Sequence, residues 1–261
     1  MASFPIIAIG AACIGLCLGL LGSGGSIVTV PVLVYLVGQD EKVAIAGSLA
    51  IVGIIALVAS VNYMWQRQVN WRMVVLFGVP GMMGTFFGAY ASAWVSGLFQ
   101  LAVFALVMLL ASYFMLKSTS TSVQPESSEI KKRNIATIGT EGALVGVVTG
   151  FVGVGGGFLI VPALALLGGL RMHQAVATSL VIIAMKSAVG FFKYLDILED
   201  QNLAIDWKVV LTVSAIGIAG SIVGNQLASR TPQTLLKKLF GGFLILMGIY
   251  ILARSAPELL A

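Results

Sequence analysis

The chain carries one glycine-rich motif twice, as GLLGSGGSIVTVP at residues 19–31 and as GFVGVGGGFLIVP at residues 150–162. Four glycines, one valine and one proline match at a constant offset of 131 residues. Ordered matches of this kind indicate an internal duplication, which is a frequent construction in secondary transporters. Each motif also interrupts a hydrophobic run, so we expect the backbone to leave its helix there.

The duplication continues beyond the motif. At the same offset, a series of small and apolar residues matches, pairing Leu33, Leu36, Ala44, Ala46, Ser48 and Leu49 with Leu164, Leu167, Ala175, Ala177, Ser179 and Leu180. A second series matches at an offset of 136, pairing Trp71, Val74, Gly81, Gly84 and Gly88 with Trp207, Val210, Gly217, Gly220 and Gly224. We therefore predict two transmembrane repeats, at residues 1–116 and 135–261, joined by a polar cytoplasmic linker at 117–134.

The composition indicates a membrane protein. Of the 261 residues, 59% are hydrophobic and 10% are charged, against roughly 45–50% and 25% in an average soluble domain. With 15 basic and 10 acidic residues, polar side chains cannot cover a soluble surface of this size. The basic residues are scattered, so the net charge of +5 does not indicate nucleic-acid binding. Cys13 and Cys17 alone suggest neither a disulfide framework nor a metal site.

The apolar segments predict helices that cross a bilayer. Eight of them are near the roughly 20 residues that one crossing needs, at residues 4–21, 43–61, 73–95, 98–116, 135–152, 174–192, 209–227 and 239–253. Two shorter segments, 26–37 and 158–167, follow the glycine motifs directly. We predict an all-α polytopic membrane protein with two homologous repeats, each containing a short half-helix broken off by glycine.

The positions of Lys and Arg slightly favour inverted repeats. With the basic triplet at 131–133 in the cytoplasm, inverted repeats place ten basic residues inside and four outside, leaving Lys186 within the membrane. Parallel repeats give nine inside and five outside. Because basic residues concentrate on the cytoplasmic side, we favour the inverted arrangement and keep the parallel one as the alternative.

The two glycine motifs are the predicted anion site. Irregular backbone at membrane depth is tolerated only where it is buried in protein or lines a polar cavity. A short helix that begins after the glycines directs its N–H groups and positive dipole end at a bound anion. The predicted binding residues are Gly22, Ser23, Gly24, Gly25, Ser26, Gly153, Gly155, Gly156 and Gly157. Close helix packing is the alternative role of such glycines, and we expect it for Gly81, Gly84, Gly88, Gly217, Gly220 and Gly224.

Two ionisable residues lie well inside apolar segments. Lys186 is near the middle of its segment, where a charge costs about 2.5–3.5 kcal/mol, so we expect it to neutralise the bound anion. An internal ion pair with Glu141 is the alternative. Glu141 itself is a candidate proton-coupling carboxylate, unless it lies close enough to the headgroups to stay hydrated.

Other polar residues have two possible roles each. The hydroxyls of Ser48, Thr178 and Ser179 could donate to the oxygens of an anion or bond back to their own helices. We expect Asn62, Lys193, Asn225 and Gln226 at the membrane interface. The lone His173 receives no predicted role.

Both glycine motifs fit the pattern Gly-x-Gly-Gly-x-x-x-x-Val-Pro. Together with the stretches at 44–49 and 175–180 and the ending at 239–248, they resemble the TauE/SafE sulfite exporter family. The resemblance covers nearly the whole chain outside the linker. It implies a multi-pass permease of the cell inner membrane that exports small sulfur anions such as sulfite, sulfoacetate or other organosulfonates. Ser26 stands where the second motif has Gly157, which makes the two halves of the site unequal.

We expect transport by alternating access, with a small anion and the lipid bilayer as partners. The sequence contains no nucleotide-binding domain, so a proton or other gradient must drive transport. No cofactor, metal or nucleic acid is expected, whereas a homo-oligomer is compatible with the sequence. An intramembrane enzyme would need paired aspartates or a His-Glu-x-x-His motif, which are missing. A channel or a membrane subunit acting on another anion remains the alternative.

Overall fold

The computed structural model describes residues 4–22, 24–117 and 135–260, which form helices and turns without strands. The helices of the first half are α1 (Phe4–Leu21), α2 (Gly24–Pro31), α3 (Glu41–Trp65), α4 (Trp71–Met73), α5 (Val79–Ala91) and α6 (Gly97–Lys117). Those of the second half are α7 (Ile135–Val152), α8 (Gly157–Pro162), α9 (Met172–Asp200), α10 (Trp207–Arg230) and α11 (Gln233–Leu260). The predicted all-α class is confirmed. Ser23 and residues 118–134 of the predicted linker lie outside the described residues.

Prolines divide several of the predicted segments. Short π-helical turns follow α2 (η1, Val32–Val37) and α8 (η5, Ala163–Leu167), and a third precedes α5 (η2, Val74–Gly78). Each turn adjoins or closely precedes a proline, which has no N–H to donate, so the hydrogen-bond ladder shifts locally. The predicted segment at 73–95 is for this reason split into α4, η2 and α5.

The two predicted half-helices are present. The helical stretches 24–37 and 157–167 are about 21 Å and 17 Å long at 1.5 Å per residue. Both are too short for a hydrocarbon core of about 30 Å. Each begins within its glycine motif, at Gly24 and Gly157, one or two residues before the predicted starts at 26 and 158.

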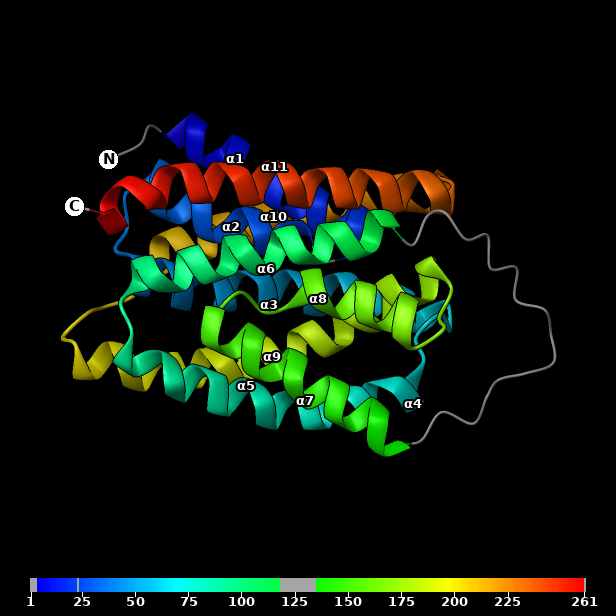
Figure 1. Ribbon diagram of the computed structural model, residues 1–261. Coiled ribbons are helices and arrows are strands. Elements are labelled where there is room, and N and C mark those ends of the chain that lie inside the picture. Colours follow the sequence, from blue (N-terminus) through cyan, green and yellow to red (C-terminus); the bar gives the residue numbers. More distant parts are fainter. Residues whose placement is uncertain (1–3, 23, 118–134, 261) are drawn as a thin grey trace.

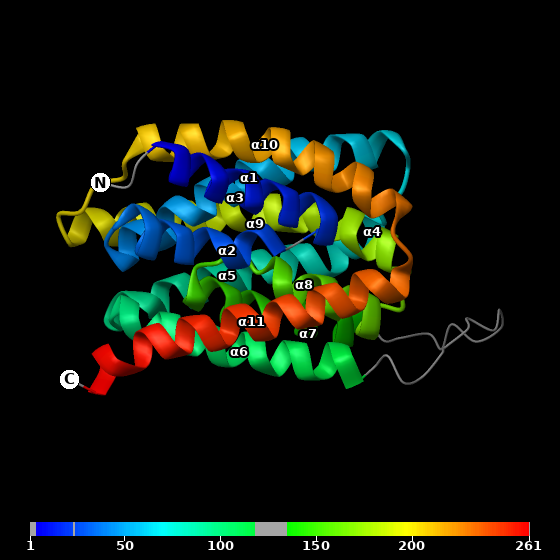
Figure 2. The ribbon, with the colours of Figure 1, turned by 90° about the horizontal axis from the view of Figure 1, so that it is seen from above.

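The chain begins and ends at the same end of the helical bundle. Figures 1 and 2 show the start of α1 and the end of α11 at one end, which we call the terminal end. The end of α6 and the start of α7 lie at the opposite end, which we call the linker end. The path through α1–α6 therefore carries the chain from one end of the bundle to the other, and the path through α7–α11 carries it back.

Helices of one half pack mainly against helices of the other. The main contacts pair α1 with α10, α5 with α7, α6 with α11 and α3 with α9, and the short helices α2 and α8 also touch. The long helices α3 and α9 are the most buried of the apolar helices. They form the centre of the molecule, so polar residues on them are shielded from the surroundings.

Glycines allow the closest of these contacts. A Cβ atom on Gly15 of α1 would overlap the backbone of Gly217 on α10, and one on Gly84 of α5 would overlap the carbonyl of Ala143 on α7. The same holds at further positions along both pairs, at Gly19, Gly220 and Gly224 and at Gly88, Gly146 and Gly150. The packing role that we predicted for the glycines of α5 and α10 agrees with these contacts, which bring backbones together as small residues do in membrane helices.

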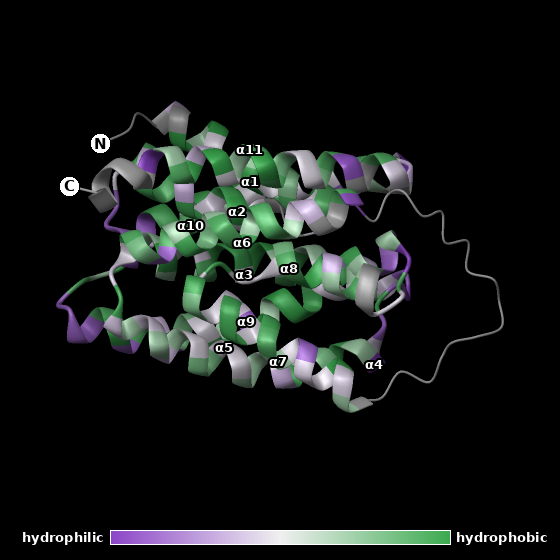
Figure 3. Ribbon diagram, in the orientation of Figure 1, coloured by the Kyte–Doolittle hydropathy of each residue, from purple (hydrophilic) through white to green (hydrophobic). Residues whose placement is uncertain are grey.

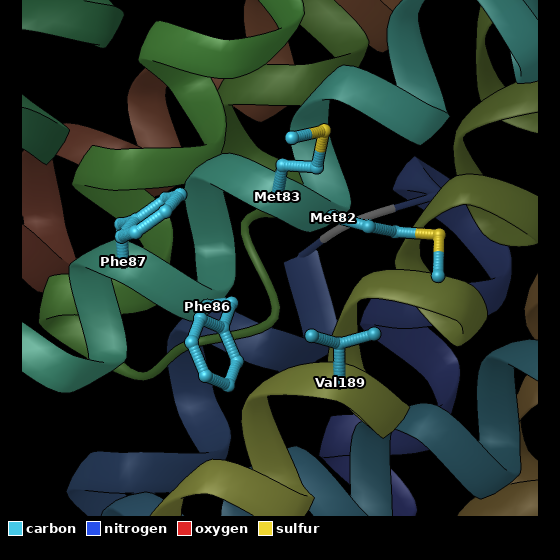
Figure 4. Close-up of a pocket in the computed structure, with 5 residues that line it drawn as sticks. All are labelled: Met82, Met83, Phe86, Phe87 and Val189. Carbon is cyan, nitrogen blue, oxygen red and sulfur yellow. The ribbon is translucent and has the colours of Figure 1, made fainter.

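The outer surface suits a lipid environment. Within the described residues, four helical stretches are long and apolar enough to cross a membrane, at Glu41–Trp65, Trp71–Trp94, Met172–Asp200 and Trp207–Ala228. Hydrophilic residues gather at the two ends of the bundle, and hydrophobic residues cover the helices between them (Figure 3). A shallow surface hollow of about 360 Å³ is lined only by Met82, Met83, Phe86, Phe87 and Val189 (Figure 4). It offers no polar group to an anion.

Candidate functional site

Both glycine motifs form turns at which a full helix stops and a short helix begins. Gly22 and Gly153 occupy the same left-handed conformation, each with φ of 70°. The second turn continues in this region at Gly155 and Gly156, with φ of 55° and 77°. Glycine is the residue that adopts such angles without strain. Gly24 and Gly157 then start α2 and α8, so the structure places seven of the predicted glycines in or next to these turns.

The serines Ser48 and Ser179 connect each central helix to the turn of the opposite half. Ser48 Oγ donates to the Gly153 carbonyl at 3.2 Å, and Ser179 Oγ donates to the Gly22 carbonyl at 3.2 Å. Each hydroxyl also bonds the carbonyl three residues earlier in its own helix, at 2.8 Å. Of the two roles considered for these serines, the structure shows the bond to the helix, and it adds a bond to the turn.

Replacing Ser48 should destabilise the protein more than replacing a serine with only a local bond. Ser48→Ala removes a buried bond to a turn carbonyl, which is worth about 1 kcal/mol. Ser60 is the matched control, since its hydroxyl bonds only Leu57 of the same helix. Thermal unfolding in detergent, followed by tryptophan fluorescence, should show the larger loss for Ser48→Ala. Equal losses would mean that the bond to Gly153 contributes nothing.

Lys186 reaches the second glycine turn from α9. Its side chain is 0% exposed, and its Nζ donates to Thr149 Oγ1 at 2.9 Å. Thr149 is the residue against which a Cβ on Gly156 would collide. Within the described part of the chain, Lys186 forms no salt bridge and no other hydrogen bond. The ammonium group therefore lies beside the turn without a compensating negative charge.

A second polar group faces the same turn. The hydroxyl of Ser187 is buried and has no hydrogen-bond partner among the described residues. A Cβ on Gly155 would lie 2.7 Å from this hydroxyl, so only glycine fits there. An unsatisfied buried hydroxyl costs about 1–3 kcal/mol. Lys186 and Ser187 thus offer a cation and a hydroxyl to whatever binds at this turn, which is the chemistry of an oxyanion site. Thr149 holds Lys186 in place, because its hydroxyl accepts from Lys186 and donates to the Gly146 carbonyl at 3.2 Å.

The other predicted binding residues lie apart from this cluster. Thr178 Oγ1 accepts a bond from the backbone N–H of Asn70 at 3.0 Å and so fixes the loop before α4. Gly25 packs against Ile14 and Leu18 of α1, and Ser26 is fully buried.

Glu141 lies on α7 and is partly exposed. The next residue, Gly142, packs against Phe77. A Cβ atom added to Gly81 of α5 would lie 3.2 Å from the Gly142 carbonyl and 3.4 Å from the Lys186 Cδ. Glu141 is thus on the helix that faces Lys186 across α5, but the hydrogen-bond partner of Lys186 is Thr149.

Sequence reasoning missed a buried polar network at the terminal end. Lys42 Nζ donates to the Ser92 carbonyl and to Gln100 Oε1, both at 2.6 Å. Gln100 Nε2 donates to Tyr194 OH at 2.8 Å and to the Phe151 carbonyl. Tyr194 OH in turn donates to the Phe151 carbonyl at 3.1 Å. Lys42, Gln100 and Tyr194 form what we call the terminal network. The sequence contains little signal for it, because Lys42 lies just before the predicted segment 43–61, beside Asp40 and Glu41.

A polar pocket opens at the linker end. It has a volume of about 290 Å³ and is lined by residues from the end of α3, the start of α9 and the end of α10, namely Asn62, Tyr63, Gln66, Gln68, His173, Asn225 and Gln226. The sequence predicted a general interface position for three of these residues and no role for His173. Their convergence depends on the packing of three helices, which the sequence alone does not specify.

Comparison with known proteins identifies similar transporters. Residues 7–251 match the family model described as sulfite exporter TauE/SafE. A probable membrane transporter protein of Xylella fastidiosa is 33% identical over 252 residues, covering 95% of this chain and 94% of its own. Similar proteins of Haemophilus influenzae and Methanocaldococcus jannaschii, both also described as probable membrane transporters, are 27% and 21% identical, covering 90% and 95% of this chain and 92% and 95% of their own. No solved structure matches.

Proposed function

The chain belongs to the TauE/SafE sulfite exporter family of membrane transporters, and from this premise we propose that it exports small sulfur oxyanions such as sulfite or organosulfonates. The observation that carries the proposal is Lys186, a fully buried cation without an acidic partner among the described residues, held beside a glycine turn. A charge at membrane depth is by default functional. A bound sulfite or sulfonate group would supply the missing negative charge and accept a hydrogen bond from Ser187.

We propose that the site is reached by alternating access of two inverted repeats. The helix contacts support two related halves, inverted or parallel. Exchanging equivalent helices turns the contact of α1 with α10 into that of α7 with α5, and it leaves the contacts α3–α9 and α6–α11 unchanged. The chain path supports the inverted arrangement, because each half carries the chain to the opposite end of the bundle (Figure 2). Such repeats place substrate sites at their interface, and the contact of α2 with α8 lies there.

The inverted arrangement predicts that Ser96 and Thr231 lie on opposite sides of the membrane. Single cysteines at these positions, in a background where Cys13 and Cys17 are alanine, are labelled in intact cells with a membrane-impermeant maleimide. We expect Ser96→Cys to react from outside and Thr231→Cys only after the membrane is opened, because the basic linker end belongs in the cytoplasm. Labelling of Thr231→Cys from outside would rule out this orientation.

Transport is tested in proteoliposomes with sulfite, sulfoacetate and chloride at set pH gradients. We expect flux of the sulfur anions, with chloride transported poorly. We further propose Glu141 as the proton-coupling carboxylate, so Glu141→Gln should retain exchange of sulfoacetate across the membrane but lose its response to a pH gradient. If no sulfur anion moves, the proposed substrate class is wrong. If Glu141→Gln responds to pH as the wild type does, coupling lies elsewhere.

A further inference from the structure

Two pairs of residues that correspond under the internal duplication differ in their hydrogen bonding. At the offset of 131 that relates the glycine motifs, Tyr63 corresponds to Tyr194, and His173 corresponds to Lys42. Tyr194 and Lys42 are both bonded within the terminal network. Tyr63 and His173 instead line the polar pocket and form no hydrogen bond with the described residues. At the terminal end these two repeat positions are therefore occupied by hydrogen-bonded side chains. At the linker end the corresponding side chains line an open pocket.

The terminal network closes the approach to the second glycine turn. Tyr194 is fully buried, and its hydroxyl lies 2.8 Å from where a Cβ on Gly153 would stand. It bonds the carbonyls of Gly150 and Phe151, at the last turn of α7 before the glycines. Lys42 and Gln100 cover it from outside, and both are buried. These hydrogen-bonded side chains block the route by which a solute could reach the second glycine turn from the terminal end.

The polar pocket lies beside the first glycine turn. Its Asn225 is on the part of α10 that packs against Gly19, the glycine at the start of the motif. Its His173 is one helical turn before Val176, the residue in contact with Gly22. The pocket thus opens at the linker end, and two of its lining residues lie at or near residues that contact the first motif.

The chemistry of the pocket suits a small anion. Of the described residues that line it, none is acidic, and their polar groups are amides, one phenol and one imidazole. Gln68 donates to Gln66 at 2.9 Å and Gln66 donates to Asn62 at 3.2 Å, so this chain of amides leaves the N–H groups of Asn62 as donors. A volume of about 290 Å³ is at the small end of ligand sites.

We propose that the polar pocket is the binding site at which a small sulfur oxyanion enters from the linker end, while the terminal network is the closed gate at the other end. This inference rests on the proposed function. Transport requires the two ends to exchange states, with Tyr63 and His173 closing over the first turn as Tyr194 and Lys42 release the second.

The test uses two single cysteines in the full chain lacking Cys13 and Cys17, reconstituted in vesicles. Asn225→Cys reports on the pocket. Ser92→Cys reports on the gate, because Ser92 is fully buried and its carbonyl accepts from Lys42. We expect an impermeant maleimide to label Asn225→Cys from the linker side, and 10 mM sulfoacetate to slow that labelling at least about threefold. Ser92→Cys should react from neither side. Thr231→Cys and Ser96→Cys mark the two sides of the vesicle.

Breaking the gate should expose the second reporter. Adding Gln100→Leu removes the bonds to Lys42 and Tyr194, so Ser92→Cys should then react from the terminal side at least about tenfold faster. Phe99→Leu, at an exposed neighbour on the same helix, is the matched control and should leave it unreactive. Lys42→Met provides a second way to open the gate if Gln100→Leu does not fold, as judged by gel filtration.

The two proposals fail differently. If Ser92→Cys reacts equally with and without Gln100→Leu, the proposed gate is wrong. If sulfoacetate does not protect Asn225→Cys, the proposed entry site is wrong. In either case, sulfoacetate flux in the same vesicles would still support the proposed transport function. If the labelling depends on Gln100 as expected and no sulfoacetate flux occurs, the gate stands and the proposed substrate class falls.

Discussion

Lys186→Met should weaken sulfoacetate binding by roughly 10- to 150-fold, which corresponds to the loss of about 1.5–3 kcal/mol for a hydrogen bond to a charged group. Methionine keeps the length and apolar contacts of the lysine stem but has neither charge nor donor. The apo protein should remain as stable as the wild type or become more stable, because an unpaired buried charge is removed. Calorimetric titration and thermal unfolding of the same preparation measure both effects.

The matched control is Lys193→Met on the same helix. Lys193 is near the terminal end and bonds Asp196 at 2.9 Å, so its loss should leave sulfoacetate affinity unchanged. A weaker affinity in both variants would indicate a general effect of positive charge rather than a site. Unchanged affinity in Lys186→Met would remove Lys186 from the binding site.

Gly15→Ala should destabilise the protein by at least about 1–3 kcal/mol, the usual cost of overpacking a tight contact. The added methyl group would overlap the backbone of Gly217, so α1 and α10 would have to move apart. Neither backbone can rotate away as a side chain could. We expect a clearly lower midpoint of thermal unfolding in detergent.

Gly242→Ala provides the control, because a Cβ there meets nothing within 4 Å. Gly242 lies within α11, where alanine is the better helix former by about 0.5–1 kcal/mol. This variant should be as stable as the wild type or more so. If the two alanine variants unfolded at the same temperature, the close packing of α1 on α10 would not be a source of stability.

Much of the fold could be predicted from sequence, because hydrophobic length and glycine position are local signals. The half-helices after Gly22 and Gly153 and the long central helices are present where the apolar pattern predicts them. Helix ends were less certain. α3 begins earlier than predicted because the Asp40 carboxylate caps the N–H of Lys42. α9 continues past residue 192 to Asp200, through a stretch in which charged residues alternate with the buried Tyr194, Ile197 and Leu198.

The site could be predicted only in part. Lys186 was identifiable because a lone charge in an apolar run is conspicuous, and the glycines because they repeat. Thr149 and Ser187 were not, since hydroxyls are ordinary within membrane helices and gain meaning only from their contacts with Lys186 and Gly155. Gln100 likewise joins Lys42 and Tyr194 across distant parts of the chain.

The most direct measurement is sulfoacetate flux into proteoliposomes that contain equal amounts of wild-type or Lys186→Met protein. We predict rapid, saturable flux with the wild type, competition by sulfite but not by chloride, and flux near that of empty vesicles with Lys186→Met. Equal flux in both would contradict the claim that the anion passes by way of Lys186 at the second glycine turn.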